Sequence, residues 1–193
     1  MGINSLIAIA VGDVSDEQLA RFGLHPTQEE VSLDETAAES TGAGVGVARL
    51  GDFTVISDGA FALRSLLEDP PPVTGTWFVT AAHSVVDEYE YRVIRDGQVV
   101  RALSLDPEGE LESRGEPVGD ESGFQPATVD DVQHYRGEDL VWMLPLTSGL
   151  EAAHPGVELL ELSGVAYDCR DEDFDEAAWT ESTATRPWWK FWG

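Results

Sequence analysis

Three strand-like segments in the middle of the chain constrain its fold more than any other feature. They are residues 77–82, 88–95 and 98–105, and short polar connections separate them. The second connection is Asp96-Gly97, a pair that favours a type I′ turn because both central positions of that turn need positive φ. Side chains also alternate along residues 89–94, as on a strand. We therefore predict an antiparallel meander.

Weaker signals precede the meander. The apolar residues 3–11 predict a buried first strand, and Ser15 with Gln18 forms a capping-box pair that predicts a helix over 16–22. Residues 27–40 fit either a weak helix or a loop. Two runs around Gly51-Asp52 predict a hairpin of residues 44–50 and 53–57, and a brief helical run over 61–67 ends before three prolines.

The second half of the chain is less regular. Residues 106–125 read as a loop or ragged strand, Thr128 resembles the N-cap of a helix toward His134, and residues 157–167 fit a late strand or helix. The expected fold class is α+β, a mainly antiparallel sheet with a central meander and a few short helices packed on it. We predict one domain over 1–167 and an acidic, Trp-rich C-terminal tail over 168–193.

The charge of the chain excludes several functions. Its 37 acidic residues against 11 basic ones give a formal net charge of -26. Nucleic-acid binding requires a positive surface, and anionic membranes repel a negative one, so neither partner is expected. A large charge keeps proteins apart in solution, which is one interpretation. Attraction to a basic protein partner is the other.

The compartment follows from cysteine usage and the N-terminal residues. Cys169 is the only cysteine, and no cationic leader precedes an apolar core of signal-peptide length. The apolar residues 3–11 are too few to span a bilayer. We expect a cytoplasmic protein without an integral membrane segment.

His83 is the best candidate for a catalytic residue. The string Thr80-Ala81-Ala82-His83 resembles the histidine motif of trypsin-like serine proteases, and residues 119–123 resemble their nucleophile motif around Ser122. The segment between His83 and Ser122 is too short to complete one barrel and enter the next, and Glu121 interrupts the glycine-flanked turn. A structural histidine is the favoured interpretation, and a small hydrolase or transferase with a site near His83 is the alternative.

No metal or cofactor is expected. The spacing of Gly42, Gly44 and Gly46 fits neither a dinucleotide fingerprint nor a phosphate loop. Asp171, Asp173 and Asp175 alternate like the start of a calcium loop, but the required later Gly and Glu are missing. The four histidines and the single cysteine show no zinc-ligand spacing.

The last eight residues form an aromatic cluster that composition does not explain. Arg186, Trp188, Trp189, Phe191 and Trp192 are residue types enriched at binding hot spots, so they are the candidate partner-binding residues. The alternatives are that the cluster packs on the core of its own domain, that it dimerises, or that it contacts a membrane interface.

One segment resembles a known group of sequences. Residues 91–105 end in Arg101-Ala102-Leu103-Ser104-Leu105 and are followed by Gly115-Glu116-Pro117. This is similar to a strand pair and loop in uncharacterised actinobacterial proteins, a family without an assigned activity. The resemblance implies the hairpin and no catalytic residue. The overall prediction is a non-catalytic interaction or regulatory protein, comparable to immunity-type modules, that binds a protein through its acidic surface or aromatic C-terminus.

Overall fold

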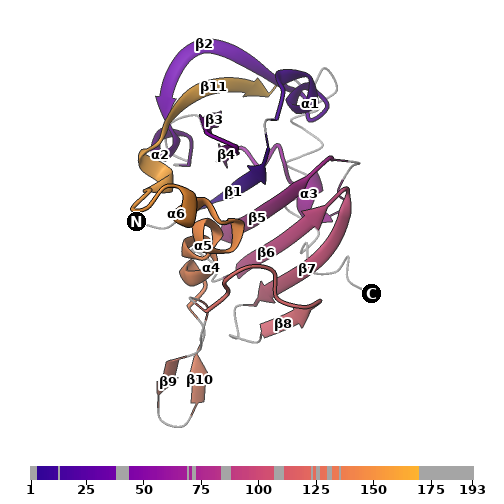
Figure 1. The fold of residues 1–193 in the computed structure, drawn as a ribbon, viewed down its shortest axis with the longest axis vertical. Coiled ribbons are helices and arrows are strands. Elements are labelled where there is room, and N and C mark those ends of the chain that lie inside the picture. Colours follow the sequence, from indigo (N-terminus) through magenta and orange to yellow (C-terminus); the bar gives the residue numbers. More distant parts are fainter. Residues whose placement is uncertain are drawn as a thin grey trace, which may run out of the picture.

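The structure is a computed structural model that describes residues 4–12, 14–37, 44–68, 70, 73–83, 88–106, 111–122, 124, 127–129, 132–134 and 136–169. Its centre is a nine-stranded sheet in the order β2-β11-β3-β4-β1-β5-β6-β7-β8, and neighbouring strands are antiparallel throughout (Figure 1). Short helices pack on both faces of this sheet. The described residues therefore have the predicted α+β architecture with a mainly antiparallel sheet, and the tail lies beyond them.

The strands and helices have the following bounds. The strands are β1 Asn4–Val11, β2 Leu24–Ser32, β3 Val45–Leu50, β4 Phe53–Asp58, β5 Thr76–His83, β6 Glu88–Arg95, β7 Gln98–Leu105, β8 Leu111–Arg114, β9 Ala127–Val129, β10 Val132–His134 and β11 Ser163–Cys169. The helices are α1 Asp16–Ala20, α2 Leu33–Ala37, α3 Ser65–Glu68, α4 Glu138–Trp142, α5 Leu144–Ser148 and α6 Leu150–Ala153, with a 3₁₀ turn η2 at Leu159–Glu161.

The first strand lies in the middle of the sheet. β1 pairs with β4 on one side and with β5 on the other, and its residues 5–10 are buried. A strand buried on both faces is apolar at nearly every position, which explains the run Leu6 to Ala10. The predicted buried first strand is confirmed.

Two apolar clusters lie on opposite faces of the sheet. The first, which we call the α5 face, includes Ile7, Ile9, Val55, Phe78, Tyr91, Val93, Leu140, Leu144 and Leu150. The second, the α3 face, includes Leu6, Ala8, Ile56, Trp77, Val79, Ile94, Leu19 and Leu66. Because strand side chains alternate between faces, residues one apart on β1 serve different clusters.

The meander and the first hairpin are as predicted. β5, β6 and β7 are consecutive antiparallel neighbours, and so are β3 and β4. The β6–β7 turn has φ of 50° at Asp96 and 77° at Gly97, as a type I′ turn requires. The helix α1 begins with the predicted capping box, in which Gln18 N–H donates to Ser15 Oγ and Ser15 N–H donates to Gln18 Oε1.

The helix predicted from Thr128 toward His134 is wrong. These residues form the two short antiparallel strands β9 and β10 instead. Thr128, Val129 and Val132 are β-branched, a feature that favours strands over a short helix without a packed face. Residues 27–32 belong to strand β2, so both alternatives predicted there, helix and loop, are wrong, and a helix, α2, forms only over residues 33–37. The late segment, predicted as strand or helix, is η2 followed by strand β11.

Both edges of the sheet are poor templates for further strand pairing. At one edge β8 has four residues. At the other, β2 carries Pro26, exposed Glu29 and Glu30, and an irregularity where its ladder with β11 shifts between Val165 and Tyr167. Short strands, proline, charges and bulges all discourage the addition of a strand. The faces of the sheet and the helices on them are therefore the surfaces available for function.

Candidate functional site

His83 lies at the end of β5 on the α3 face. Its ring stacks on that of Phe61, with ring centroids 5.1 Å apart and an interplanar angle of 24°. In the β5–β6 ladder, His83 is directly opposite Glu88, so an imidazole and a carboxylate occupy neighbouring positions. The loop that carries Phe61 positions its ring with φ of 55°, an uncommon conformation for a bulky residue.

The hydroxyl groups of the neighbouring strands point away from His83. Ser5 on β1 and Thr80 on β5 are each one residue from side chains of the α3 face, so they project to the α5 face. Ser122 belongs to a loop whose residues Val118 and Phe124 also pack on the α5 face. The structure thus separates His83 and Ser122 onto opposite faces of the sheet, which rules out the protease-like pairing.

Asp58, the last residue of β4, is a buried carboxylate on the α3 face. It is 0% exposed, and its Oδ2 accepts a hydrogen bond from the Leu63 N–H at 2.7 Å. Oδ1 has no hydrogen-bond partner among the described residues. Burial raises the pKa of Asp58 to about 6, although the backbone N–H groups of residues 60–63 partly oppose the shift. Its contact with Leu63 makes Asp58 an anchor for the loop that carries Phe61.

The substitution Asp58→Asn is expected to remove a pH dependence of stability. Because the folded pKa lies above the ordinary 3.8, Asp58 contributes most stability below pH 3.8 and loses it as the pH rises to about 6. The free energy of unfolding of the wild type, relative to that of Asp58→Asn, should fall by about 3 kcal/mol across this window. Urea unfolding of both proteins from acid to neutral pH measures this difference, and parallel curves would contradict it.

The buried ion pair between Arg101 and Glu121 lies on the α5 face. Arg101 Nε and Nη2 donate to both oxygens of Glu121 at 2.7–3.2 Å, and the side chains are 7% and 12% exposed. Arg101 Nη1 donates to Ser113 Oγ and to the carbonyl oxygens of Arg114 and Gly115. This network fastens the loop of residues 115–124 to β7. Glu121, which interrupts the protease-like motif, therefore has a structural role.

The same network gives a physical reason for the pattern around residues 101–117. Arg101 of the Arg-x-Leu-Ser-Leu string contacts the carbonyl of Gly115, the first residue of Gly115-Glu116-Pro117. Leu103 and Leu105 are buried beside it on the α5 face. The two parts of the pattern are thus joined by an arginine and a loop carbonyl, which is a structural association rather than a catalytic one.

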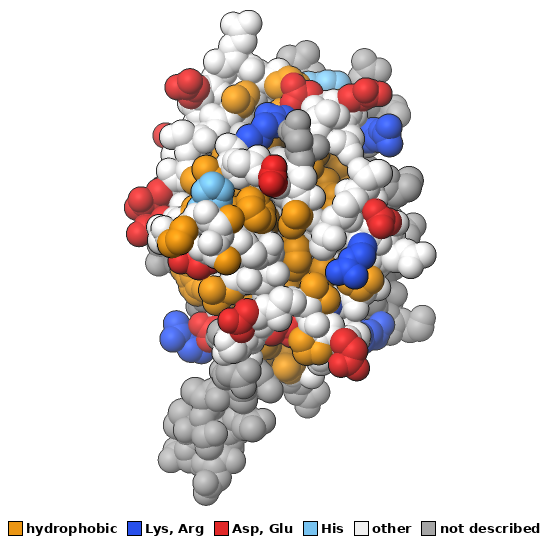
Figure 2. All heavy atoms as spheres, viewed as in Figure 1, with side chains coloured by type: hydrophobic (Ala, Val, Ile, Leu, Met, Phe, Trp, Pro, Cys, Tyr) orange, Lys and Arg blue, Asp and Glu red, His pale blue; other side chains and the backbone are white. Residues whose placement is uncertain are grey.

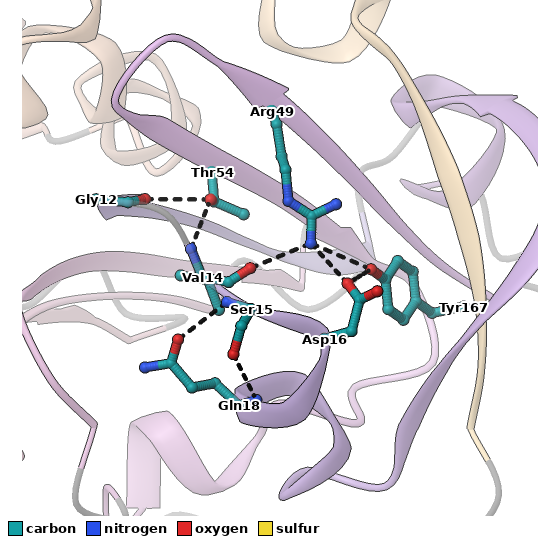
Figure 3. Close-up of polar contacts among 8 residues, drawn as sticks. All are labelled: Gly12, Val14, Ser15, Asp16, Gln18, Arg49, Thr54 and Tyr167. Atoms are coloured by element: carbon teal, nitrogen blue, oxygen red, sulfur yellow. Dashed lines mark hydrogen bonds and ion pairs between the residues drawn. The ribbon is translucent and has the colours of Figure 1, made fainter.

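A third polar cluster joins α1 to β3 and β11, and Figure 3 shows the Asp16 side chain between Arg49 and Tyr167. The Tyr167 hydroxyl donates to Asp16 Oδ1 at 2.6 Å, and Arg49 Nη2 donates to the same oxygen at 2.7 Å and to the Val14 carbonyl at 3.1 Å. These bonds, led by that from Tyr167, hold the pKa of Asp16 below its ordinary value. The cluster ties the first helix to two distant strands.

Most arginines in the described part of the chain form ion pairs. Six arginines each lie within 4 Å of a carboxylate, in the pairs Arg49–Asp16, Arg64–Glu68, Arg92–Glu90, Arg101–Glu121, Arg114–Glu112 and Arg136–Asp139. Many further carboxylates, such as Glu29, Glu30, Asp34 and Asp168, are exposed. These six arginines are thus neutralised locally, and the excess of carboxylates determines the sign of the net charge.

The remaining candidates are placed as follows. The tail residues Arg186, Trp188, Trp189, Phe191 and Trp192 lie outside the described residues, as do Gly42 and the aspartates at 171, 173 and 175. Within the described residues, no three His, Cys, Asp or Glu side chains are grouped as metal ligands would be. None of the helices in that part of the chain is long and apolar enough to cross a membrane.

Comparison with known proteins gives no indication of function. The chain matches no protein family, no curated protein and no solved structure. Three features escaped the sequence reasoning: buried Asp58, the Arg101–Glu121 pair and the exposed Trp142. For two of these residues a signal existed, because Asp58 on β4 and Arg101 on β7 each share a strand face with apolar neighbours. Glu121 lies in a loop and left no such signal.

Proposed function

We propose that this protein is a non-catalytic cytoplasmic binding protein whose partner is a basic protein. The supporting observation is the formal net charge of -26, together with the pairing of six described arginines with local carboxylates. Such a field accelerates encounters with a positively charged partner and discourages acidic ones. An immunity-type or regulatory module, which neutralises a basic target by covering it, fits this description.

The C-terminal aromatic residues are the proposed specific contacts. Electrostatic attraction sets the rate and sign of binding, while buried aromatic and arginine side chains supply most of the affinity at typical interfaces. Arg186, Trp188, Trp189, Phe191 and Trp192 provide both residue types within eight positions. The acidic surface would then attract the partner, and the terminal residues would fix it.

Capture from a lysate of the source organism tests this function. The intact chain and a chain ending at Thr185 are immobilised, and bound proteins are identified at about 0.05 M and about 0.5 M salt. We expect a basic protein that is retained at low salt and released at high salt, whereas an unrelated protein of similar net charge fails to retain it. Bound proteins no more basic than the lysate average would contradict the proposal.

The truncated chain distinguishes the two proposed contact surfaces, the terminal residues and the acidic surface of the domain. A basic partner held by the intact chain and lost by the chain ending at Thr185 assigns specificity to the terminal residues. A partner held equally by both assigns it to the acidic surface of the domain. Both results retain the binding function and change only the residues that carry it.

A hydrolase or transferase site near His83 is the second candidate. The observation that favours it is the cross-strand position of Glu88 opposite His83, since a carboxylate that orients an imidazole is a common catalytic arrangement. The hydroxyls of Ser5 and Thr80 point to the other face, so neither of these two can serve as a nucleophile beside His83. Loss of a measured hydrolytic activity in His83→Gln, with unchanged folding, would establish this alternative.

A further inference from the structure

Two exposed apolar side chains lie next to each other on α4 and α5. Trp142 is 54% exposed and Leu146 is 38% exposed. Met143, between the two helices, has helical φ and ψ of -73° and -24°, and its carbonyl accepts the Thr147 N–H at 3.0 Å. The helical path therefore continues from α4 into α5, and residues four apart lie on one side of it. We call this pair the Trp142–Leu146 patch.

The helical segment is apolar on both sides. Its inner side packs into the α5 face through residues including Leu140, Val141 and Leu144, and the patch covers its outer side. Exposed apolar patches on a protein surface mark contact sites. In Figure 2, drawn in the same view as Figure 1, hydrophobic side chains gather across the middle of the molecule, and both acidic and basic side chains lie around them.

The terminal residues of the same chain have the chemistry that complements this patch. Residues 186–193 read Arg-Pro-Trp-Trp-Lys-Phe-Trp-Gly, with four aromatic and two cationic side chains and no acidic one. Removing those two positive charges from the total of -26 leaves -28 for residues 1–185. Asp139, three residues before Trp142, places a carboxylate beside the patch, and Arg136 Nε lies 3.9 Å from that carboxylate. The terminal sequence therefore offers aromatic and cationic residue types, which complement an apolar pair on a domain of net negative charge.

The chain is long enough to bring these residues to the patch. The described residues end at Cys169, on β11. Residues 170–185 span up to about 55 Å when fully extended. A compact domain of this length is about 40 Å across. Half the circumference of such a domain is about 63 Å, so the connection reaches most of the surface but not the point opposite Cys169.

We propose that residues 186–193 dock on the Trp142–Leu146 patch of their own molecule. Tethering helps, because a short linker gives an effective concentration of about 1 mM, so a contact with a Kd of about 0.1 mM would be formed in about 90% of molecules. The inference goes beyond the proposed function, since it concerns the chain without a partner. A partner that takes the terminal residues would expose the patch.

Fluorine NMR of the protein labelled with 5-fluorotryptophan tests the docking directly. Trp142→Phe identifies the signal of Trp142, and a soluble neutral gadolinium chelate broadens the signals of exposed side chains. We expect the Trp142 signal to be protected in the intact chain and to lose this protection in a chain ending at Thr185. Equal broadening in the two chains would overturn the proposal.

A synthetic peptide of residues 186–193 supplies the second test. It should bind the chain ending at Thr185, and Trp142→Ala or Leu146→Ala should weaken that binding, the former by about tenfold or more. Val99→Ala is the matched control, because Val99 is an exposed apolar residue on β7 (40% exposed) and should leave the affinity unchanged. Circular dichroism confirms that each variant is folded. Equal affinity for Trp142→Ala and the unmutated chain would overturn the proposal.

Light scattering over a range of concentrations separates docking within one molecule from docking between two. Protection of Trp142 in a monomer supports the proposal, and protection that arises only with a dimer overturns it. Neither the NMR nor the peptide measurement contains a partner protein. Failure of this inference therefore leaves the proposed binding function to its own test.

Discussion

Replacing Arg101 by alanine is expected to lower the free energy of unfolding by about 3–5 kcal/mol. The substitution leaves the Glu121 carboxylate, whose side chain is 12% exposed, without its bidentate partner. It also removes the donor for Ser113 and for two loop carbonyls. A buried charge that loses its partner retains the full cost of its desolvation, which exceeds the value of the pair itself. Urea unfolding followed by circular dichroism measures the loss.

A neighbouring ion pair supplies the control. Arg114 and Glu112 on β8 approach to 3.7 Å, and their side chains are 64% and 72% exposed. Exposed pairs contribute about 0–1 kcal/mol, so Arg114→Ala should change stability little. A double variant that replaces Arg101 and Glu121 by apolar residues should recover part of the loss, because no charge then remains buried. Equal effects of Arg101→Ala and Arg114→Ala would show that the buried pair is not structural.

The parts of the fold that could be predicted from the sequence depend on local interactions. The Asp96-Gly97 turn and the Ser15–Gln18 capping box involve residues adjacent or three apart, and both are present. The meander follows from its turns, since short connections join antiparallel neighbours. The prediction from local sequence was wrong for residues 128–134. The resemblance of Thr128 to an N-cap predicted a helix, whereas the β-branched residues of this segment form β9 and β10.

The order of the strands could not be predicted, because it depends on pairings between distant segments. β1 lies between β4 and β5, and β11 lies between β2 and β3, although more than 110 residues separate β11 from β3. Nothing in the pattern of an individual strand specifies its neighbour when many strands are apolar on both faces.

Two of the buried charges can be recognised from the alternation of side chains between the two faces of a strand. Arg101, Leu103 and Leu105 share one face of β7, so the arginine occupies a position that points into the core. Asp58 likewise follows Ile56 on one face of β4. Alternation therefore indicates that a charge is buried, but its partner depends on the tertiary fold. Glu121, in a loop 20 residues after Arg101, is such a partner.

Gly119→Ala tests whether the loop of residues 115–124 is held against α5 as closely as the structure indicates. A Cβ at Gly119 would overlap the carbonyl oxygen of Thr147, and φ at this position is 76°. Gly149 is the matched control, with φ of 82° and no atom within 4 Å of an added Cβ. The backbone term, about 1 kcal/mol, is common to both substitutions. Steric overlap with backbone adds about 1–3 kcal/mol to Gly119→Ala alone.

The difference between these two variants therefore measures the loop–helix contact. Because the contact lies next to the Arg101–Glu121 pair in the chain, losing it should also weaken the hold of the loop on β7. We expect Gly119→Ala to be destabilised by about 2–4 kcal/mol and Gly149→Ala by about 1 kcal/mol in urea unfolding. If both lose the same amount, the loop has room to move away from α5, and the Arg101–Glu121 pair alone fastens it to the sheet.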